Sequence, residues 1–392
     1  MSKKIMAINS GSSSLKFKLF EMPSETVMLE GQFERIGEQT SQFSYKYQGE
    51  KTIKKHPVYN HREAVEWLMR EMVDVGILDS LEDIEGIGHR ISHGGTYYKG
   101  ATLIDETVME RIGELGTLSP LHNPVNLIGI KAFRDVLPMI PSVAIFDTSF
   151  SHTITPDKHV YAIPYHFYEA YGIKRYGFHG ISHQYIAEQL PQYVAEEKLG
   201  RVISCHLGSG GSLSALSHGK TINNSMGFTP LAGIVMGTRS GDVDPQILPY
   251  IAEKTGKDVF EIKEMLNKES GLLGISKLSN DCRDVEEAAF AGNQQAQLAL
   301  DVYIQSICKY VGSYLVDLGG LDTLVFTAGI GEHSSYIRTE VCKRLAFLGL
   351  KIDEDKNQKN ETYIHHPTSQ VDVIVIPTDE EIIIAREVFR KI

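Results

Sequence analysis

Two arginines in glycine-rich surroundings are the residues best placed to do chemistry. Arg90 lies in the segment Gly88–Gly95 (GHRISHGG), and Arg239 lies in Gly237–Asp242 (GTRSGD). A guanidinium group stays charged and binds carboxylate or phosphoryl oxygens through paired N–H groups. An ordinary surface arginine, the alternative, needs no glycines around it, so we predict that both arginines bind an anion.

A histidine in a similar setting adds a candidate oxyanion donor. His179 lies in Tyr176–Gly180 (YGFHG), and His183 follows four residues later. Two histidines at this spacing on a helix can also ligate zinc. However, the glutamate of an HExxH motif is missing and the preceding glycines favour a loop. We therefore expect His179 to donate a hydrogen bond to an anion and disfavour a zinc site.

Carboxylates occur at two positions typical of ligand binding. Asp147 follows the apolar run Val143–Phe146, and Glu380 and Glu381 open the last apolar stretch. A carboxylate at the end of a strand is well placed as a ligand, a base or a metal donor. Capping of the following helix is the alternative for each.

Two turns rich in Gly and Ser, Asn9–Ser14 and His206–Ser212, offer backbone N–H groups and hydroxyls that can hold phosphate. After the first turn, alternation over Leu15–Leu19 places Lys16 and Lys18 on one strand face. Neither turn matches the GxxxxGK[ST] or GxGxxG pattern. A plain hairpin with a solvated face remains the alternative.

Short apolar runs must position these residues. Each glycine-rich or polar turn follows a predicted strand, over residues 5–8, 202–205, 324–327 and 371–376. Strands that end in such turns place ligands at strand ends in α/β folds. Apolar residues at helical spacing predict helices over 61–75 and 294–318, and a short closing helix over 380–392.

A weak internal repeat organises these elements. When Gly11 is aligned with Gly208, both segments read as strand, polar residue, Gly/Ser turn and second strand, with Asn9 opposite His206. This predicts two duplicated α/β domains with a cleft between them. We place the first domain at 1–150 plus 380–392, with the closing helix packed back on it, and the second at 151–379.

Composition excludes several classes of protein. The 392 residues fit two or three domains, and a net charge of −11 argues against nucleic acid or an anionic membrane as a partner. Four cysteines without CxxC spacing suggest neither a zinc site nor a redox motif. No signal peptide or membrane span is expected, so we predict a cytoplasmic protein.

Taken in order along the chain, these segments resemble the acetate kinase family of the acetate and sugar kinase, heat-shock protein and actin superfamily. The matching segments are Asn9–Lys16, Gly88–Gly95, Pro120–Pro124, Phe146–Thr148, Tyr176–Gly180, His206–Gly208, Ser225–Pro230, Met236–Asp242, Asn267–Ile275, Phe326–Glu332 and Ile376–Glu381. The resemblance implies two duplicated actin-like (ribonuclease H-like) α/β domains flanking a nucleotide cleft. It also implies reversible phosphoryl transfer from ATP to acetate, giving acetyl phosphate and ADP, by a homodimer.

The resemblance also implies site residues. Arg90 would bind the substrate carboxylate, His179 and Arg239 would stabilise the phosphoryl group in transfer, and Asp147 would be a catalytic carboxylate that orients groups. The other implied contacts are an acyl pocket of Ser92, Leu121, Phe178 and Pro230, a Mg²⁺ site (Mn²⁺ as the alternative metal) of Asn9 and Glu380, and a nucleotide site of Ser12, Ser14, Lys16, His206, Leu207, Gly208, Ser209, Gly210, Asp281, Cys282, Arg283, Gly329, Ile330, Gly331, Glu332 and His333.

Three positions depart from the family pattern. Ser209 stands where HLGNG has asparagine, His333 where GIGEN has asparagine, and Ser92 where GHRVVHGG has its second valine. A smaller wall at Ser92 would admit a longer acid, so propionate or another short acyl acid is the alternative substrate. Ser209 and His333 leave a non-catalytic nucleotide sensor as a remote alternative. Two arginines and a histidine suit a sugar hydroxyl less well than an anion.

Overall fold

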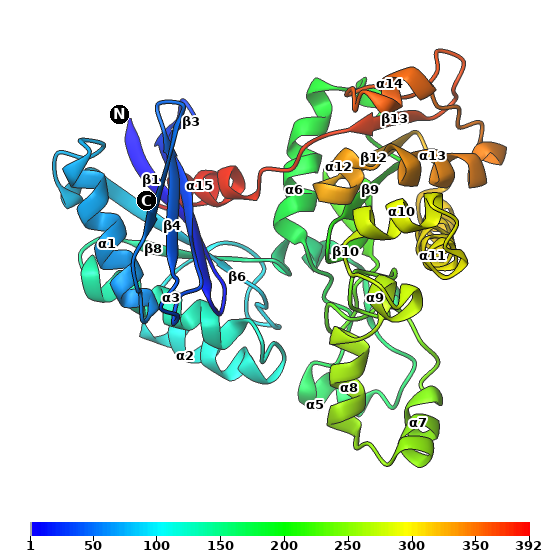
Figure 1. Cartoon of the computed structure of the whole chain (residues 1–392), viewed down its shortest axis with the longest axis horizontal. Coiled ribbons are helices and arrows are strands. Elements are labelled where there is room, and N and C mark those ends of the chain that lie inside the picture. The colour runs from blue at the N-terminus through cyan, green and yellow to red at the C-terminus, as the bar shows by residue number, and fades with distance from the viewer. Residues whose placement is uncertain (1) are drawn as a thin grey trace. The chain divides into compact units, whose positions relative to one another are not determined.

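The computed structural model describes residues 2–392, which divide into two compact units. Unit 1 comprises the residues up to Phe150 together with Asp379–Ile392, and unit 2 comprises Ser151–Thr378. Each unit is a mixed α/β structure built on one sheet (Figure 1). In the described residues, no helix has the length and apolar composition needed to cross a bilayer.

Unit 1 contains an eight-stranded sheet in the order β5-β4-β3-β2-β1-β6-β8-β7. Strands β1 to β5 form an antiparallel meander, and β6 and β8 continue the sheet parallel to β1. The strands are β1 (Lys3–Ser10), β2 (Ser14–Met22), β3 (Thr26–Glu34), β4 (Gln42–Tyr47), β5 (Glu50–Lys55), β6 (Ile84–Ile91), β7 (Thr102–Leu103) and β8 (Ser142–Phe146). The helices are α1 (His61–Asp74), α2 (Glu106–Glu114), α3 (Asn123–Val136) and α15 (Glu380–Lys391).

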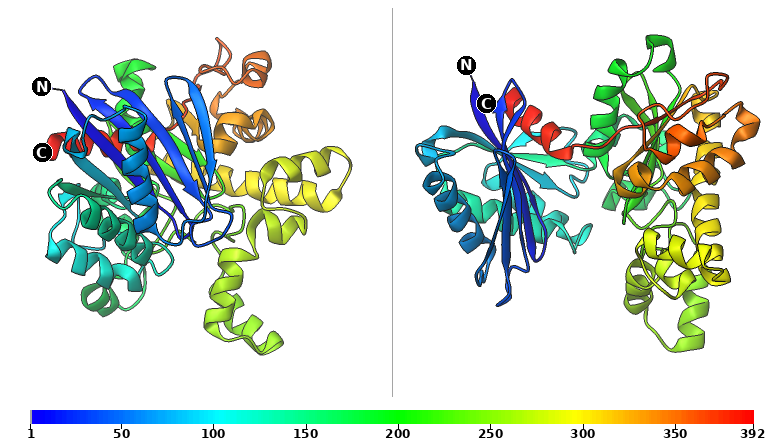
Figure 2. Two further views of the ribbon diagram at one scale, coloured as in Figure 1. Left: turned by 60° about the vertical axis from the view of Figure 1, so that its left-hand side comes forward. Right: turned by 45° about the horizontal axis from the view of Figure 1, so that its top comes forward.

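The two faces of this sheet are covered by different helices. Met6 and Ile8 of β1 pack into the core formed with α1 and α3. The buried residues Ile5 and Ala7 belong to the other face, because side chains alternate along a strand. There α15 packs on β1, β2, β6 and β8 (Figure 2).

Unit 2 contains a five-stranded sheet in the order β11-β10-β9-β12-β13. The strands are β9 (Val202–Leu207), β10 (Gly211–Ser217), β11 (Lys220–Asn224), β12 (Thr323–Thr327) and β13 (Asp372–Val375). The helices are α4 (Pro156–His159), α5 (His166–Tyr171), α6 (Gly180–Gln189), α7 (Ile247–Thr255), α8 (Val259–Lys268), α9 (Gly271–Ser276), α10 (Cys282–Phe290), α11 (Gln294–Leu318), α12 (Ala328–His333), α13 (Ser335–Arg344) and α14 (Glu354–Gln358).

Local signals explain the longest helix of unit 2. The side chain of Asn293 accepts hydrogen bonds from the N–H groups of Gln295 and Ala296 and starts α11, and Gly319 at φ +70° ends it. Leu300, Ile304 and other residues on its apolar stripe are fully buried in the unit 2 core. The helix predicted over 294–318 is therefore confirmed.

The predicted duplication is confirmed by the two sheets. Strands β3-β2-β1-β6-β8 of unit 1 and β11-β10-β9-β12-β13 of unit 2 share one order. In both, three antiparallel strands are followed by two parallel ones. Asn9 and His206 occupy the same position in the repeat, just before the turn that joins its first two strands.

Two glycines of β6 allow α15 to approach the sheet closely. A Cβ atom on Gly88 would lie 2.7 Å from a methyl group of Val388 and closer still to Ile384. A Cβ atom on Gly86 would lie 2.7 Å from Val388 as well. The sequence Gly86-Ile87-Gly88 thus sets the distance between β6, which carries Arg90, and the helix that begins at Glu380.

We expect Gly88→Ala to lower the free energy of unfolding by about 1–3 kcal/mol, because the added methyl group overpacks the contact with α15. Urea denaturation followed by circular dichroism measures this. Gly100→Ala is the matched control, since a Cβ there meets no atom within 4 Å. Equal stability of the two variants would contradict the packing role of Gly88.

Candidate active site

Arg90 in unit 1 is held by two carboxylates. Its Nη2 lies 2.7 Å from Oδ2 of Asp147, and its Nε lies 3.2 Å from both carboxylate oxygens. The Nε atom also lies 3.7 Å from Oε2 of Glu380. Three elements supply this cluster: Arg90 is on β6, Asp147 follows β8, and Glu380 begins α15.

The paired geometry leaves one side of the guanidinium open. Asp147 occupies the edge formed by Nε and Nη2, so the N–H groups of Nη1 can receive a second anion. Burial disfavours the charged form of Arg90, but the attraction of Asp147 and Glu380 outweighs it and raises the pKa of Arg90. Asp147 is itself buried and directed at Arg90, and only a short 3-10 turn, Ser149–Thr153, follows it.

The surroundings of Glu380 disfavour its ionised form. Burial raises the pKa of Glu380, and the charges of Asp147 and Glu381 add to the increase while Arg90 opposes it. A cation would relieve this repulsion. Among the described residues no group of three or more His, Cys, Asp or Glu side chains could by itself hold a metal ion.

These donors nevertheless suit magnesium. Mg²⁺ prefers oxygen ligands and is usually held by one or two carboxylates, with water and substrate phosphates completing its shell. Glu380 supplies a carboxylate, and Asn9 on β1 supplies an amide oxygen. The residues present thus fit a weakly anchored Mg²⁺ ion rather than a closed protein cage.

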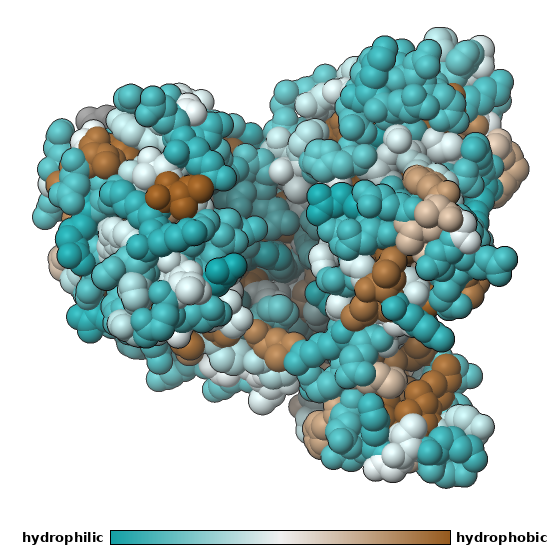
Figure 3. All heavy atoms as spheres, in the orientation of Figure 1, coloured by the Kyte–Doolittle hydropathy of each residue, from teal (hydrophilic) through white to brown (hydrophobic). Residues whose placement is uncertain are grey.

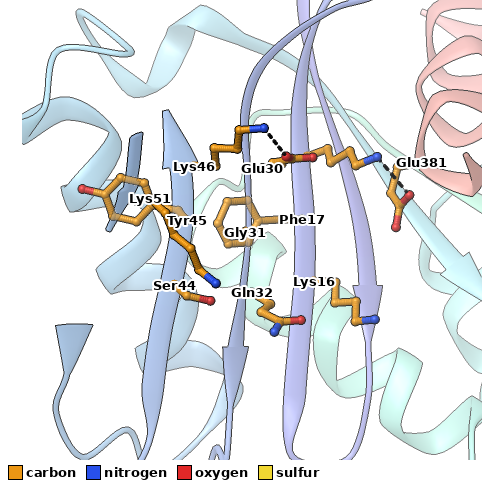
Figure 4. Close-up of a pocket in the computed structure, with 11 residues that line it drawn as sticks. Lys16, Phe17, Glu30, Gly31, Gln32, Ser44, Tyr45, Lys46, Lys51 and Glu381 are labelled. Carbon is orange, nitrogen blue, oxygen red and sulfur yellow. Dashed lines mark ion pairs between the residues drawn. The ribbon is translucent and has the colours of Figure 1, made fainter. Parts of the chain in front are cut away.

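The two lysines after the first turn have different surroundings. They share one face of β2, as predicted. Lys16 is exposed and lines an open groove of about 330 Å³ on the sheet of unit 1 (Figure 4). Lys18 also lines this groove, but it pairs with Asp379 at 3.1 Å and with Glu381 at 3.4 Å, so it anchors the start of α15.

The first Gly/Ser turn is short and partly open to solvent. The N–H of Gly11 donates to the carbonyl oxygen of Ser14 at 2.8 Å and closes the turn between β1 and β2. Ser12 is exposed and Ser14 is half-buried at the start of β2. Lys16 lies directly opposite Asn9 in the ladder, so the turn and the lysine share one end of the sheet.

Ser92 has a polar neighbour that sequence analysis missed. Oγ of the buried Ser119 donates a hydrogen bond to Oγ of Ser92 at 3.3 Å. The N–H of Ser92 donates to Oδ1 of Asn126 at 3.1 Å. Leu121 is half exposed. Ser119 directly precedes the Pro120–Pro124 segment, and that adjacency was the only signal in the sequence.

His179 in unit 2 has a constrained backbone conformation and a ring held by its neighbours. It has φ +55°, a left-handed conformation uncommon outside glycine, and α6 begins at the next residue. Its Nδ1 lies 3.0 Å from Oγ of Ser212, and its ring stacks on His206 with centroids 4.2 Å apart. His206 in turn contacts Oγ of Ser182 through Nδ1 at 2.8 Å.

The loop expected around His183 is wrong. His183 lies on α6, because the helix starts directly after the left-handed residue. Both of its ring nitrogens are bonded to serine hydroxyls, Nδ1 to Ser204 at 3.0 Å and Nε2 to Ser212 at 2.8 Å. Both ring nitrogens of His183 are thus used in contacts within the fold.

Arg239 is a half-buried cation without a carboxylate. Its Nη1 donates to the carbonyl oxygen of Pro230 at 3.0 Å, and within residues 2–392 it forms no ion pair. Burial lowers the pKa of Arg239. Since an uncompensated buried charge is costly, this guanidinium marks a place for an anion.

Arg239 and His179 converge on one glycine. A Cβ atom placed on Gly210 would lie 3.4 Å from both terminal nitrogens of Arg239 and 3.4 Å from Nε2 of His179. Gly210 belongs to the turn between β9 and β10, the second of the two turns predicted to hold phosphate. Two side chains from other segments, a cation and a histidine, therefore meet at this turn.

A pocket of about 570 Å³ follows this turn in unit 2. It gathers eight of the residues predicted for the nucleotide: Gly208, Ser209, Asp281, Cys282, Arg283, Gly329, Ile330 and His333. It also includes three residues that sequence analysis missed, namely Asn280, Glu286 and Ser334. Each of these is adjacent to a predicted residue or one helical turn from it.

Other residues predicted for the nucleotide lie outside the pocket lining. Leu207 is fully buried in the core, and Glu332 accepts a hydrogen bond at 3.1 Å from the N–H of Thr378. The remaining ones in unit 2 are His206, Gly210 and Gly331. Phe178 is buried with Met226 and Met236, while Pro230 is half-buried beside Arg239.

Comparison with known proteins places the chain in a family. A sequence model of the acetokinase family matches residues 4–386. The chain is 50% identical to propionate kinase PduW of Salmonella typhimurium over 396 residues, which covers 100% of this chain and 97% of that protein. It is 48% identical to the acetate kinase of Bacillus subtilis over 390 residues, with 99% of each covered.

A solved structure agrees with the sequence relatives. The acetate kinase of Porphyromonas gingivalis superposes with a TM-score of 0.92 at 39% identity, covering 99% of both chains. The family model extends over nearly the whole chain, and the relatives are matched along their full length. This chain belongs to the acetokinase family.

Proposed function

We propose that this protein transfers a phosphoryl group reversibly between ATP and acetate, giving acetyl phosphate and ADP. The observation that carries the proposal is the pairing of Arg239, a guanidinium without a carboxylate partner, with His179 at Gly210. An oxyanion in that position would be stabilised by both groups. Membership in the acetokinase family supports a carboxylate as the acceptor.

In the proposed reaction, a carboxylate oxygen of acetate forms a bond to the γ-phosphorus while the bond to the ADP oxygen breaks. Acetate is ionised at neutral pH, so no base has to remove a proton. The protein therefore contributes positioning and charge stabilisation. Arg239 neutralises charge on the transferred phosphoryl oxygens, and His179 donates a hydrogen bond to them.

Arg90 binds the acetate carboxylate through its open Nη1 edge in this proposal. Asp147 holds the other edge and so fixes the plane of the guanidinium. Asp147 therefore acts on Arg90 rather than as a base. The acyl group of the substrate lies toward Ser92, which directly follows β6, the strand that carries Arg90.

Unit 2 is the proposed nucleotide-binding domain, with ATP in the pocket of about 570 Å³. Asn9 and Glu380 would hold Mg²⁺, largely through water, with Mn²⁺ as an alternative metal. When bound, the ion supplies positive charge to the ATP phosphates. Lys16 and the hydroxyls of Ser12 and Ser14 add donors for phosphate on unit 1.

Propionate is the second candidate substrate. Ser92 and its partner Ser119 present a smaller and more polar wall than the valine of the family pattern. A change of one methylene in such a wall is worth about 1–3 kcal/mol of discrimination. One relative at 50% identity is named a propionate kinase, which supports testing this acid.

We also propose a cytoplasmic location and a homodimer. The four cysteines are free thiols, as is usual in a reducing compartment. Large apolar side chains are exposed in residues 163–171 and 243–260, among them Tyr171, Tyr250 and Phe260. Figure 3 shows apolar atoms on the part of unit 2 that carries α7 and α8. Such patches support a subunit interface.

With ATP, Mg²⁺, acetate and hydroxylamine, the protein is expected to form acetyl hydroxamate. Arg239→Ala should lower kcat by about 10²–10³-fold, because it removes a group that stabilises the transition state. Arg62→Ala is the control, since Arg62 is exposed and pairs only at the surface. No acid-dependent product from the wild type would refute a kinase, and ATP binding without turnover would support a nucleotide sensor.

Comparison of kcat/KM for acetate, propionate and butyrate tests the acyl pocket. We expect both acetate and propionate to react. Ser92→Val should lower the kcat/KM for propionate relative to that for acetate by about 10-fold or more. Ser92→Ala should leave the ratio near that of the wild type because it keeps the space. An unchanged ratio in Ser92→Val would exclude Ser92 from the acyl pocket.

Light scattering coupled to size-exclusion chromatography should give a mass near twice the 43.7 kDa of one chain. Phe260→Asp should shift the protein toward the monomer, because a charge would be buried in the interface. Phe347→Asp is the control, since Phe347 is also exposed in unit 2 but lies outside the two apolar segments. A monomer mass for the wild type at micromolar concentration would contradict the homodimer.

A further inference from the structure

A buried row of hydrogen-bonded side chains ends on His179. Ser204 contacts Nδ1 of His183 at 3.0 Å, Nε2 of His183 contacts Ser212 at 2.8 Å, and Ser212 contacts Nδ1 of His179 at 3.0 Å. Three elements build the row, because Ser204 is on β9, Ser212 is on β10 and His183 is on α6. These three residues are fully buried.

His183 is neutral in this environment. Burial lowers the pKa of His183 well below its usual value, and the neighbouring His206 adds to the effect. A neutral imidazole has one N–H donor and one lone pair. Because both of its nitrogens are bonded to hydroxyls, His183 must donate to one serine and accept from the other.

The proton count links the two histidines. The hydroxyl of Ser212 has a single proton, and it lies between Nε2 of His183 and Nδ1 of His179. When His183 donates through Nε2, the proton of Ser212 goes to Nδ1 of His179. A neutral His179 then carries its own proton on Nε2, the atom beside Arg239 and Gly210.

The backbone conformation of His179 is a second reason to expect that neighbouring side chains hold this residue in place. A histidine at φ +55° occupies a sparsely populated region, which persists only where the surroundings hold it. Ser212 bonds one edge of the ring, and His206 stacks on its face with centroids 4.2 Å apart. The ring therefore has a defined plane and a defined edge directed at Gly210.

We propose that His183 is a positioning residue for phosphoryl transfer, and that it acts through Ser212 to keep Nε2–H of His179 directed at the transferred group. The inference rests on the proposed function, because it needs a phosphoryl oxygen at Gly210. His183 does not touch the substrate in this role. No proton is transferred to the substrate, and the row sets only which nitrogen of His179 is the donor.

Ser212→Ala tests the link with the least disturbance, since it removes one oxygen and leaves both histidines. We expect kcat to fall by about 10- to 100-fold, the size typical of a misplaced catalytic group, while KM for ATP and acetate changes little. Ser214→Ala is the matched control. Ser214 is also fully buried on β10, but its hydroxyl donates to the carbonyl oxygen of Asn223 instead.

Three further measurements separate positioning from a general loss of structure. In a His179→Asn background, Ser212→Ala should cause no additional loss of kcat, because residues that act through one group are not additive. With ¹⁵N-labelled histidine, NMR should show a changed tautomer for His179 in Ser212→Ala and not in Ser214→Ala. His183→Gln, whose amide can replace Nε2–H, should retain more activity than His183→Leu.

Wild-type kcat in Ser212→Ala, or a loss that multiplies in the His179→Asn background, would overturn the positioning role. An equal loss in Ser214→Ala would show that the strand itself is disturbed, and would also overturn it. These results are distinct from failure of the proposed function, in which the wild type forms no acyl phosphate at all.

Discussion

The constraint behind the candidate site is the cost of burying a guanidinium. Unit 1 meets it with carboxylates, since Arg90 is held by Asp147 and lies near Glu380. That cluster joins the ends of β6 and β8 to the first turn of α15, and Lys18 with Asp379 and Glu381 secures the same helix end. One ion-pair cluster thereby connects segments that are far apart in the sequence, because the chain returns to unit 1 only at Asp379.

In unit 2, the cost of burying a guanidinium is not offset by a carboxylate within the described residues. Arg239 is half-buried beside Pro230 and has no carboxylate among the described residues, so its charge is available to a ligand. The two arginines are therefore suited to different anions. A guanidinium already held by Asp147 is rigid and can orient an incoming carboxylate through its open edge. One without a carboxylate gains most from the charge that develops on a phosphoryl group.

The duplicated sheets place different chemistry at equivalent positions. In unit 1 the residue before the turn is Asn9, opposite Lys16, and in unit 2 it is His206, opposite Ser212. The first turn therefore offers an amide and an ammonium group, whereas the second is surrounded by histidines, serines and Arg239. The shared architecture supplies the strand ends, and local substitutions decide what each can bind.

Much of this protein could be predicted from its sequence. Helical spacing predicted the helices at 61–74, 294–318 and 380–391 to within one residue at each end, because one face of each is apolar and its ends carry capping signals. Short apolar runs predicted β1, β9, β12 and β13, whereas β3, β4 and β5 were not predicted. Glycine-flanked motifs singled out Arg90, His179 and Arg239, and the end of an apolar run singled out Asp147; their roles in the reaction remain predictions.

Only the tertiary structure decided how those side chains are partnered. The sequence does not reveal that Arg90 shares its guanidinium with Asp147 and Glu380, or that His183 lies on a helix and contacts His179 through Ser212. Nor does it reveal Ser119 beside Ser92, or Glu286 and Ser334 in the pocket of unit 2. The physical reason is that periodicity and motifs report local preferences of the backbone. Hydrogen bonds and ion pairs between distant residues depend instead on strand register and helix packing, which are properties of the assembled fold.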